Sequence, residues 1–373
     1  MKNSFKQILT LIIIIIMIIS GDFIINSKNT NPENKQSIRN PVDTVGFATH
    51  PEQMDYIMKY TDSVVKQSGK AMGTINNKIS EPWKLVISPH DDYTYVGSIY
   101  PELLSNIKAK TIILIGVCHK AKQFKLENKL VFDSYTHWKE PYGNVKCSQL
   151  REKIIEQLPN DMYEINDSMQ AVEHSVEAII PFLQYYNRNI EIISILVPYM
   201  PYSRMNEIAV PLSKAINEVT LKNHLKWGKD FAIIISNDAV HYGDQDWGGK
   251  NFALYGADSA GYKQAIAHEN EIINSCLTKN ITLDKIRNFV NYTVKENDFK
   301  EYKWTWCGRY SVPFGLLTSY YLQSLMNIKL SGTLIKYATS IDHTPIPVDK
   351  IGMGVTAPAN IHHWVGYAAI GYK

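Results

Sequence analysis

The sequence has no long run of basic residues, and its formal net charge is only +3 over 373 residues. Proteins that bind nucleic acid usually concentrate Lys and Arg on one surface, so we expect no nucleic-acid partner. The chain also has no internal repeat and only one segment with the composition of a linker. With 45% hydrophobic and 20% charged residues, it has the composition of a globular protein. We therefore expect one large folded domain.

Cysteine is scarce, and none of the four residues belongs to a Cys-x-x-Cys pair. A structural zinc ribbon needs such pairs and is therefore not expected. In an oxidising compartment, Cys118, Cys147, Cys276 and Cys307 could form two disulfides, in any of three connectivities. If Cys307 instead serves as a metal ligand, its thiol must stay reduced.

The N-terminus carries a marked apolar run. Lys2 and Lys6 precede "ILTLIIIIIMII", which is shorter than the roughly 20 residues that span a bilayer comfortably. We interpret residues 1–28 as a signal peptide or an N-terminal membrane anchor, 29–42 as a polar linker and 43–373 as the folded domain. We expect this domain outside the cytoplasm, either secreted or attached to a membrane through the N-terminal segment.

Strand and helix patterns alternate through most of the remaining chain. Nearly continuous apolar, β-branched runs, typical of strands covered on both faces, occur at 84–88, 111–117, 129–133, 191–197, 231–236 and 332–338. Helical spacing occurs at 51–68, 96–108, 148–158, 172–187, 202–219, 250–277 and 311–326. The last residues, "HHWVGYAAIGYK", read as a final strand. The alternation predicts an α/β fold with a largely parallel or mixed central sheet and helices on both faces.

Three of the predicted strands end in histidine. His90 follows the first strand, His119 follows the second, and His241 follows the strand at 231–236, three residues after Asp238. Ligands in open α/β sheets bind beyond the carboxyl ends of the strands, where such loops meet. A single loop histidine is more often structural, but three of them on one rim favour a mononuclear metal site or an acid/base site.

Two further segments supply candidates. Glu173 and His174 open an amphipathic helix predicted over 169–183, and Cys307 and Arg309 stand just before another helix. A thiolate there is stabilised by the helix dipole and by cations, so Cys307 is either a low-pKa ligand or nucleophile, or a small buried residue in a turn. Arg309 is either an anion clamp for substrate or the partner of a surface carboxylate. The remaining histidines are read as surface or structural residues: His50, His137, His224, His268, His343, His362 and His363.

Six motifs occur in a fixed order over about 84–370: "SPHDDYTYVGS", "IGVCHK", "EHSVEAIIPFLQ", "SNDAVHYG", "CGR" and "GYAA". Together they resemble the Memo-like family, also called AmmeMemoRadiSam system protein B, whose fold is similar to class III, LigB-type extradiol dioxygenases. The resemblance implies a LigB-like fold. It also implies metal ligands at His90, His119 and Cys307, and a metal such as iron or copper with redox activity.

The resemblance also places Asp238, His241 and the Glu173-His174 pair in the same cleft. Asp91 and Asp92, however, stand where the family usually has small residues, and Lys120 stands where some members carry a second histidine. The two aspartates would either supply an oxygen ligand or a partner for a ligand histidine, or cap the helix that starts near Gly97. We favour the first role for one of them.

Three functions follow from these residues. The leading one is a metal-dependent oxidoreductase with one transition metal, iron in the first place and copper or zinc as alternatives. His90, His119 and Cys307 would hold the metal. The predicted catalytic residues are Asp238, His241 and His174, with Asp238 orienting His241 as acid/base. The predicted substrate-binding residues are Tyr93, Glu173 and Arg309.

The alternatives are a metallohydrolase, in which His241 or His174 shuttles the proton of a metal-activated water, and a non-catalytic protein that binds a metal or a peptide. The expected ligand is an unidentified small molecule or peptide.

Overall fold

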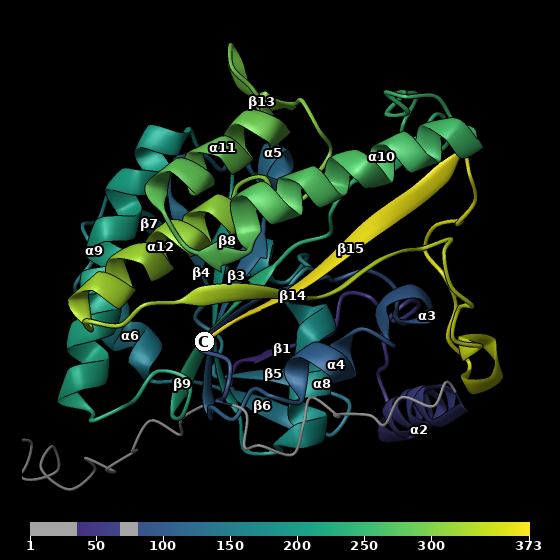
Figure 1. The fold of residues 1–373 in the computed structure, drawn as a ribbon. Helices are drawn as coiled ribbons and strands as arrows, with labels where there is room; N and C mark the ends of the chain where they lie inside the picture. Colours follow the sequence, from purple (N-terminus) through teal and green to yellow (C-terminus); the bar gives the residue numbers. More distant parts are fainter. Residues whose placement is uncertain (1–35, 68–80) are drawn as a thin grey trace, which may run out of the picture. The chain divides into compact units, whose positions relative to one another are not determined.

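Four buried parallel strands form the middle of the sheet in the computed structural model, which describes residues 36–67 and 81–373 (Figure 1). In spatial order they are β8 (Glu191–Val197), β3 (Thr111–Val117), β9 (Phe231–Ser236) and β2 (Leu85–Ser88). Apart from Glu191, every residue in them is buried. The apolar runs therefore predicted these strands correctly, because helices cover both of their faces.

Further strands, several of them antiparallel, extend this core and make the sheet mixed. β15 (His363–Tyr372) pairs with β2 and with β14 (Ser331–Thr339). On the other side, β6 (Gly143–Cys147) follows β8, then β5 (His137–Glu140) and β1 (Ile38–Arg39). The shorter strands are β4 (Leu130–Phe132), β7 (Tyr163–Ile165), β10 (His241–Gly243), β11 (Lys279–Asn280), β12 (Val294–Lys295) and β13 (Asp298–Tyr302). The predicted mixed α/β sheet is confirmed.

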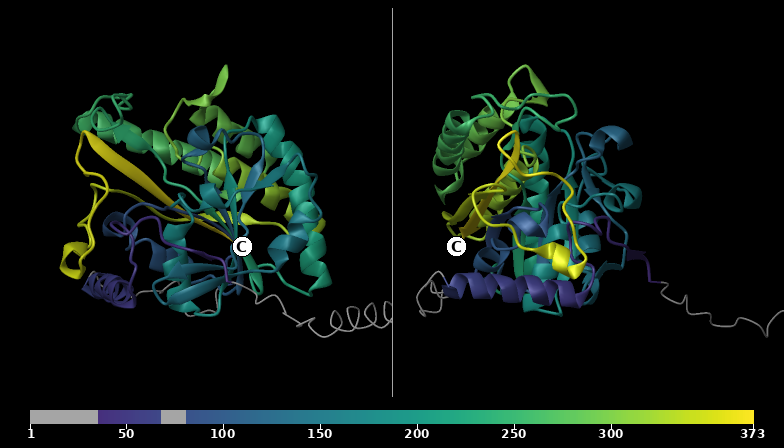
Figure 2. Two further views of the ribbon diagram at one scale, coloured as in Figure 1. Left: turned by 180° about the vertical axis from the view of Figure 1, so that it is seen from behind. Right: turned by 90° about the vertical axis from the view of Figure 1, so that its right-hand side faces the viewer.

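Helices cover both faces of the sheet, and each face has its own apolar core (Figure 2). One face packs against α6 (Leu150–Ile155), α9 (Tyr202–Lys222), α10 (Ser259–Ile272), α11 (Leu283–Thr293) and α12 (Ser311–Leu325). The other packs against α2 (Pro51–Gln67), α3 (Tyr93–Val96), α4 (Tyr100–Leu104) and α8 (Ile180–Tyr186). Short turns complete the set: α5 (Ala121–Phe124), α7 (Asp167–Gln170), η1 (Glu177–Ile179), η2 (Ile273–Leu277) and η3 (Val348–Ile351).

The helix predicted over 169–183 is wrong in part. α7 ends at Gln170, residues 171–176 are irregular, and η1 and α8 follow. Pro181 lies in the first turn of α8, where its missing N–H costs nothing. Glu173 and His174 lie in the irregular residues 171–176 and do not begin a helix.

The N-terminal boundary also differs from the expectation. The folded unit runs from Ser37 to Lys373, so the end of the predicted linker at 29–42 belongs to it, including β1. The predicted leader at 1–28 lies outside the described residues. Among the described residues, no helix has the length and hydropathy that a membrane span requires. All four cysteines are free and buried, so the disulfides considered from the sequence are not formed.

Candidate metal centre

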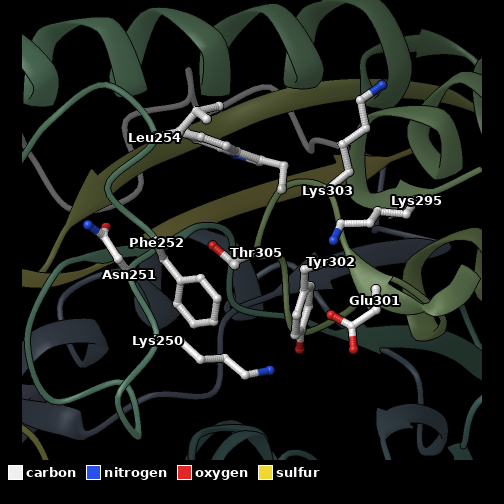
Figure 3. Close-up of a pocket in the computed structure, with 10 residues that line it drawn as sticks. Lys250, Asn251, Phe252, Leu254, Lys295, Glu301, Tyr302, Lys303 and Thr305 are labelled. Atoms are coloured by element: carbon white, nitrogen blue, oxygen red, sulfur yellow. The ribbon is translucent and has the colours of Figure 1, made fainter.

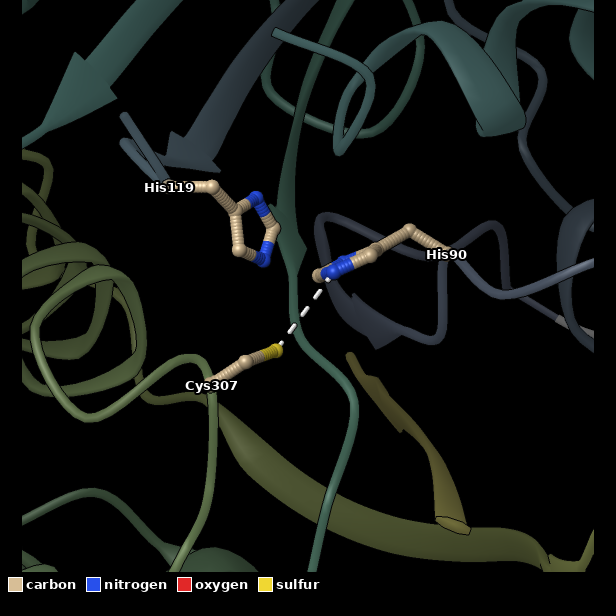
Figure 4. Close-up of side chains that lie close together, drawn as sticks. All are labelled: His90, His119 and Cys307. Atoms are coloured by element: carbon tan, nitrogen blue, oxygen red, sulfur yellow. Dashed lines mark hydrogen bonds between the residues drawn. The ribbon is translucent and has the colours of Figure 1, made fainter. Parts of the chain in front are cut away.

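Three of the predicted ligands meet at the carboxyl ends of the parallel strands. His90 follows β2, His119 follows β3, and Cys307 lies in the loop before α12. Their donor atoms lie within 4.8 Å of one another, and Cys307 Sγ is 3.4 Å from His90 Nε2 (Figure 4). This triad of two imidazoles and one sulfur could hold a metal ion.

The hydrogen bonds of His90 determine which ring nitrogen carries the proton. The Ser236 hydroxyl donates to the Ser175 carbonyl at 2.5 Å, so its oxygen is left to accept from His90 Nδ1 at 2.7 Å. His90 is therefore protonated on Nδ1, and the lone pair on Nε2 points toward Cys307. Burial, followed by repulsion from the neighbouring histidines His119, His174 and His241, lowers the pKa of His90 well below its usual value, so the ring is neutral.

His119 is oriented by the buried carboxylate of Glu173. Its Nδ1 donates to Oε1 at 2.8 Å and its backbone N–H donates to Oε2 at 2.7 Å, which leaves Nε2 free. Burial alone would raise the pKa of Glu173. The charge and hydrogen bond of His119, the charge of His174 and the Ser175 N–H outweigh it and bring that pKa to about 2. The substrate-binding role predicted for Glu173 does not fit, because both oxygens are used inside the protein. A carboxylate behind a histidine is instead typical of metal sites.

The low pKa that was one of the two alternatives for Cys307 is not found. Burial and the nearby Asp238 carboxylate raise the pKa of the thiol well above its usual value. The backbone N–H of Asp238 donates to Sγ at 3.0 Å, which is too weak an effect to reverse the burial. The sulfur therefore needs a bound cation to become a thiolate, and metal binding would release its proton.

Of the predicted acid/base pair, His241 lies near the candidate ligands, but Asp238 does not orient it. His241 can place a nitrogen within 4.8 Å of Cys307 Sγ and an Asp238 oxygen, and burial above all lowers its pKa to about 3. Asp238 does not orient it by a described hydrogen bond: Oδ1 accepts the backbone N–H of His90 at 2.8 Å, and Oδ2 lies 3.5 Å from His90 Nε2. His174 stacks on His119 with ring centroids 4.6 Å apart, and burial lowers its pKa to about 4. Both imidazoles are thus neutral bases at neutral pH.

Tyr93 and Arg309 do not line the centre. Tyr93 is fully buried, and its hydroxyl donates to the Ala178 carbonyl at 2.7 Å, so it belongs to the core and not to a cleft wall. The Arg309 guanidinium lies 3.5 Å from the centre of the Tyr302 ring and donates to the Lys300 carbonyl at 2.8 Å. Within the described residues its side chain makes no hydrogen bond or ion pair with His90, His119 or Cys307, so it does not act as a clamp there.

Asp91 and Asp92 tie the first ligand loop to the C-terminal part of the chain. Tyr367 donates its hydroxyl to Asp91 at 2.6 Å, and the backbone N–H of Thr356 donates to Asp92, also at 2.6 Å. Asp92 precedes α3 but makes no capping bond with its side chain. In the described part of the chain neither carboxylate bonds to a ligand histidine side chain. Both roles considered from the sequence are therefore replaced by a structural one.

One histidine near the centre is missed by the sequence reasoning. His363 is 3% exposed, donates from Nδ1 to the Gln245 carbonyl and stacks on Trp247 with centroids 3.8 Å apart. β15 pairs with β10, so His363 lies on the same ribbon as His241. His363 Nε2, His241 Nε2 and Trp247 Nε1 have no hydrogen-bond partner among the described residues. The nearly continuous apolar run that follows His363 could have indicated that this histidine is buried as well, because every residue of β15 is buried.

A separate pocket of about 400 Å³ is lined by residues from 250–254 and 295–305 (Figure 3). The residues around it are Lys250, Asn251, Phe252, Leu254, Lys295, Glu301, Tyr302, Lys303, Trp304 and Thr305. Thr305 connects the two regions, because its hydroxyl donates to the His241 carbonyl at 2.5 Å. None of the candidate metal ligands lines this pocket, so its size says nothing of the chemistry at the centre.

The fold and the two-histidine, one-cysteine centre define an α/β protein with a candidate metal site at the carboxyl ends of its parallel strands. Residues 50–355 match the family model described as Memo-like protein, and the chain belongs to this family.

Several curated relatives are similar to the chain. MEMO1 family protein MTH_45 of Methanothermobacter thermautotrophicus is 27% identical over 168 residues, which are 44% of this chain and 56% of that protein. A MEMO1 family protein of Aquifex aeolicus is 31% identical over 43% of this chain and 54% of its own length. MEMO1 family protein PF1638 of Pyrococcus furiosus is 24% identical over 69% and 80%. The chain spans about half the length of the first of these relatives.

Proposed function

We propose that this Memo-like protein is a metal-dependent oxidoreductase related to extradiol dioxygenases. It would hold one transition metal, iron in the first place, at His90, His119 and Cys307. The observation that carries the proposal is that internal hydrogen bonds leave the Nε2 lone pairs of both imidazoles free within reach of Cys307 Sγ. Three protein donors leave coordination positions for substrate, as catalytic metal sites do.

When bound, such an ion supplies redox chemistry and polarises an oxygen ligand. The residues of the chain do the rest. Ser236 and Glu173 keep the two imidazoles in the orientation that binds metal. His241, which burial keeps neutral, would be the residue placed to accept a proton from a substrate hydroxyl or amine at this site. The substrate we propose is a small molecule or peptide that carries such a group.

Elemental analysis of protein purified without oxygen tests the proposal. We expect about one metal ion per chain in the wild type and a loss of that metal in His119→Ala and Cys307→Ser. His343→Ala is the matched control, since this histidine bonds to Asp342 and the Tyr95 carbonyl, away from the centre. Absence of stoichiometric metal from the wild type, or full metal content in both variants, would overturn the metal centre.

A metallohydrolase is the second candidate, because His174 and His241 are both neutral bases beside the candidate ligands. Dioxygen separates the two functions. An oxygenase consumes it and stops working when iron is replaced by zinc, whereas a zinc hydrolase is indifferent to dioxygen.

We further propose that the domain works outside the cytoplasm, secreted or attached to a membrane through its N-terminal segment. The charged start and apolar run within residues 1–28 support this location. Cell fractionation combined with N-terminal sequencing of the mature chain tests it. The full-length protein in the cytoplasmic fraction would contradict it.

A further inference from the structure

Arg39 is a buried arginine in the predicted polar linker, and its side chain contacts the segment that carries Glu173. It lies in β1 at the edge of the sheet and is 1% exposed. We propose that Arg39 is a positioning residue for the metal centre, which holds the Glu173 segment so that His119 faces the metal. This inference rests on the proposed metal site, but it also makes a claim about the metal-free protein.

The guanidinium bonds to three points of the irregular segment. Nε donates to the Gln170 carbonyl at 2.8 Å, Nη2 to the Glu173 carbonyl at 2.5 Å and Nη1 to the Glu177 carboxylate at 2.5 Å. The aromatic ring of Trp138 lies on one face of the group, 4.0 Å from it. Arg39 therefore fastens both ends and the middle of residues 170–177.

This fastening is needed because residues 171–176 do not form a helix. In a continuous helix, the carbonyls of Gln170 and Glu173 would accept backbone N–H groups four residues later. Here Arg39 supplies donors to them, and a buried carbonyl without a donor is costly. A lysine could not replace it, since one ammonium cannot reach three acceptors in a planar fork.

The segment that Arg39 holds orients the ligands. The Glu173 carboxylate accepts both the backbone and the Nδ1 hydrogen of His119. Two residues on, the Ser175 carbonyl accepts the hydroxyl of Ser236, the residue that orients His90. A shift of the segment would move these acceptors together and turn both imidazoles.

The N-terminal segment is itself fastened to the same place. The Glu177 carboxylate that pairs with Arg39 also accepts the backbone N–H groups of Val42 and Asp43, at 3.0 and 3.1 Å. Residues 39–43, which follow the predicted leader, are thus hydrogen-bonded to Glu177 at the end of the segment that carries Glu173.

Co(II) binding to the full chain tests the inference, because the visible absorption of bound Co(II) reports the geometry of its ligands. Losing a residue that supports a ligand typically lowers metal affinity by about 10- to 100-fold. We expect Arg39→Gln and Arg39→Lys to lower Co(II) affinity at least tenfold and to change the absorption bands. We also expect faster hydrogen exchange of the backbone at 171–177 in the metal-free variants.

Arg151→Gln is the matched control. Arg151 is also a buried arginine paired with a carboxylate, Asp133, but it does not contact the segment of Glu173. It should lose comparable stability and keep the Co(II) spectrum and affinity of the wild type. Arg39 variants with wild-type spectrum, affinity and exchange would overturn the inference. If the wild type binds no Co(II), the proposed metal function fails, and hydrogen exchange alone decides whether Arg39 holds the segment.

Discussion

Replacing Glu173 with glutamine tests the support of the metal centre most directly. Glu173 accepts three hydrogen bonds, from the backbone N–H and Nδ1–H of His119 and from the Ser175 N–H. Glutamine has one oxygen, and its NH₂ group would face an N–H donor. At least one buried donor then loses its acceptor, which costs about 1–3 kcal/mol of unfolding free energy. The carboxylate that fixes His119 for metal binding is also lost, so we expect metal affinity to fall about 10- to 100-fold.

Two measurements separate these effects. Competition against a chelator of known affinity gives the metal dissociation constant, and chemical denaturation of metal-free protein gives the free energy of unfolding. Glu140→Gln is the matched control, because Glu140 is also buried and burial raises its pKa well above the usual value, so glutamine mimics its neutral form. A Glu173→Gln protein whose metal affinity stays within twofold of the wild type would refute the reasoning.

Three further predictions concern the surroundings of the centre. Ser236→Ala removes the acceptor for His90 Nδ1 and should lower metal affinity about tenfold, with loss of the protected Nδ1–H signal in nitrogen NMR spectra. Burial, partly offset by hydrogen bonds, raises the pKa of Glu269 from 4.5 to about 7. The folded state therefore favours protonated Glu269. The free energy of unfolding should fall by about 3 kcal/mol as pH rises from about 4.5 to 7. Denaturation experiments on Glu269→Gln should show a smaller dependence on pH. Trp247→Ala uncovers the ring of His241, so the pKa of His241 measured by NMR should rise toward its usual value; an unchanged pKa would show that Trp247 does not desolvate it.

The sequence predicted the core strands and the convergence of ligands, because both leave strong local signals. Continuous apolar runs such as 111–117 and 231–236 are typical of strands buried on both faces, and a histidine directly after such a strand must lie at one rim. The sequence did not predict β5 and β6, since their sequences "HWKE" and "GNVKC" are short and half polar. Such segments carry little of the periodicity that identifies a strand.

The residues that support the ligands could not be predicted in the same way. Arg39 lies in a polar stretch, and its partners Gln170 and Glu177 are more than 130 residues away in sequence. Only the three-dimensional fold shows that a charged residue there is buried and paired. For the same reason the sequence assigned Tyr93 to the cleft. Its contact with Ala178 depends on how the irregular residues 171–176 lead into η1.

The position of β15 determines when the centre can be completed. β2, which carries His90, is paired with β15 on one side and β9 on the other, and Tyr367 of β15 bonds to Asp91 beside that histidine. Residues 363–372 leave the ribosome after all three candidate ligands, so these pairings form late, and contacts between distant segments form slowly. Until they form, the loop of His90 lacks the hydrogen bond between Tyr367 and Asp91. We therefore expect metal to enter a finished sheet.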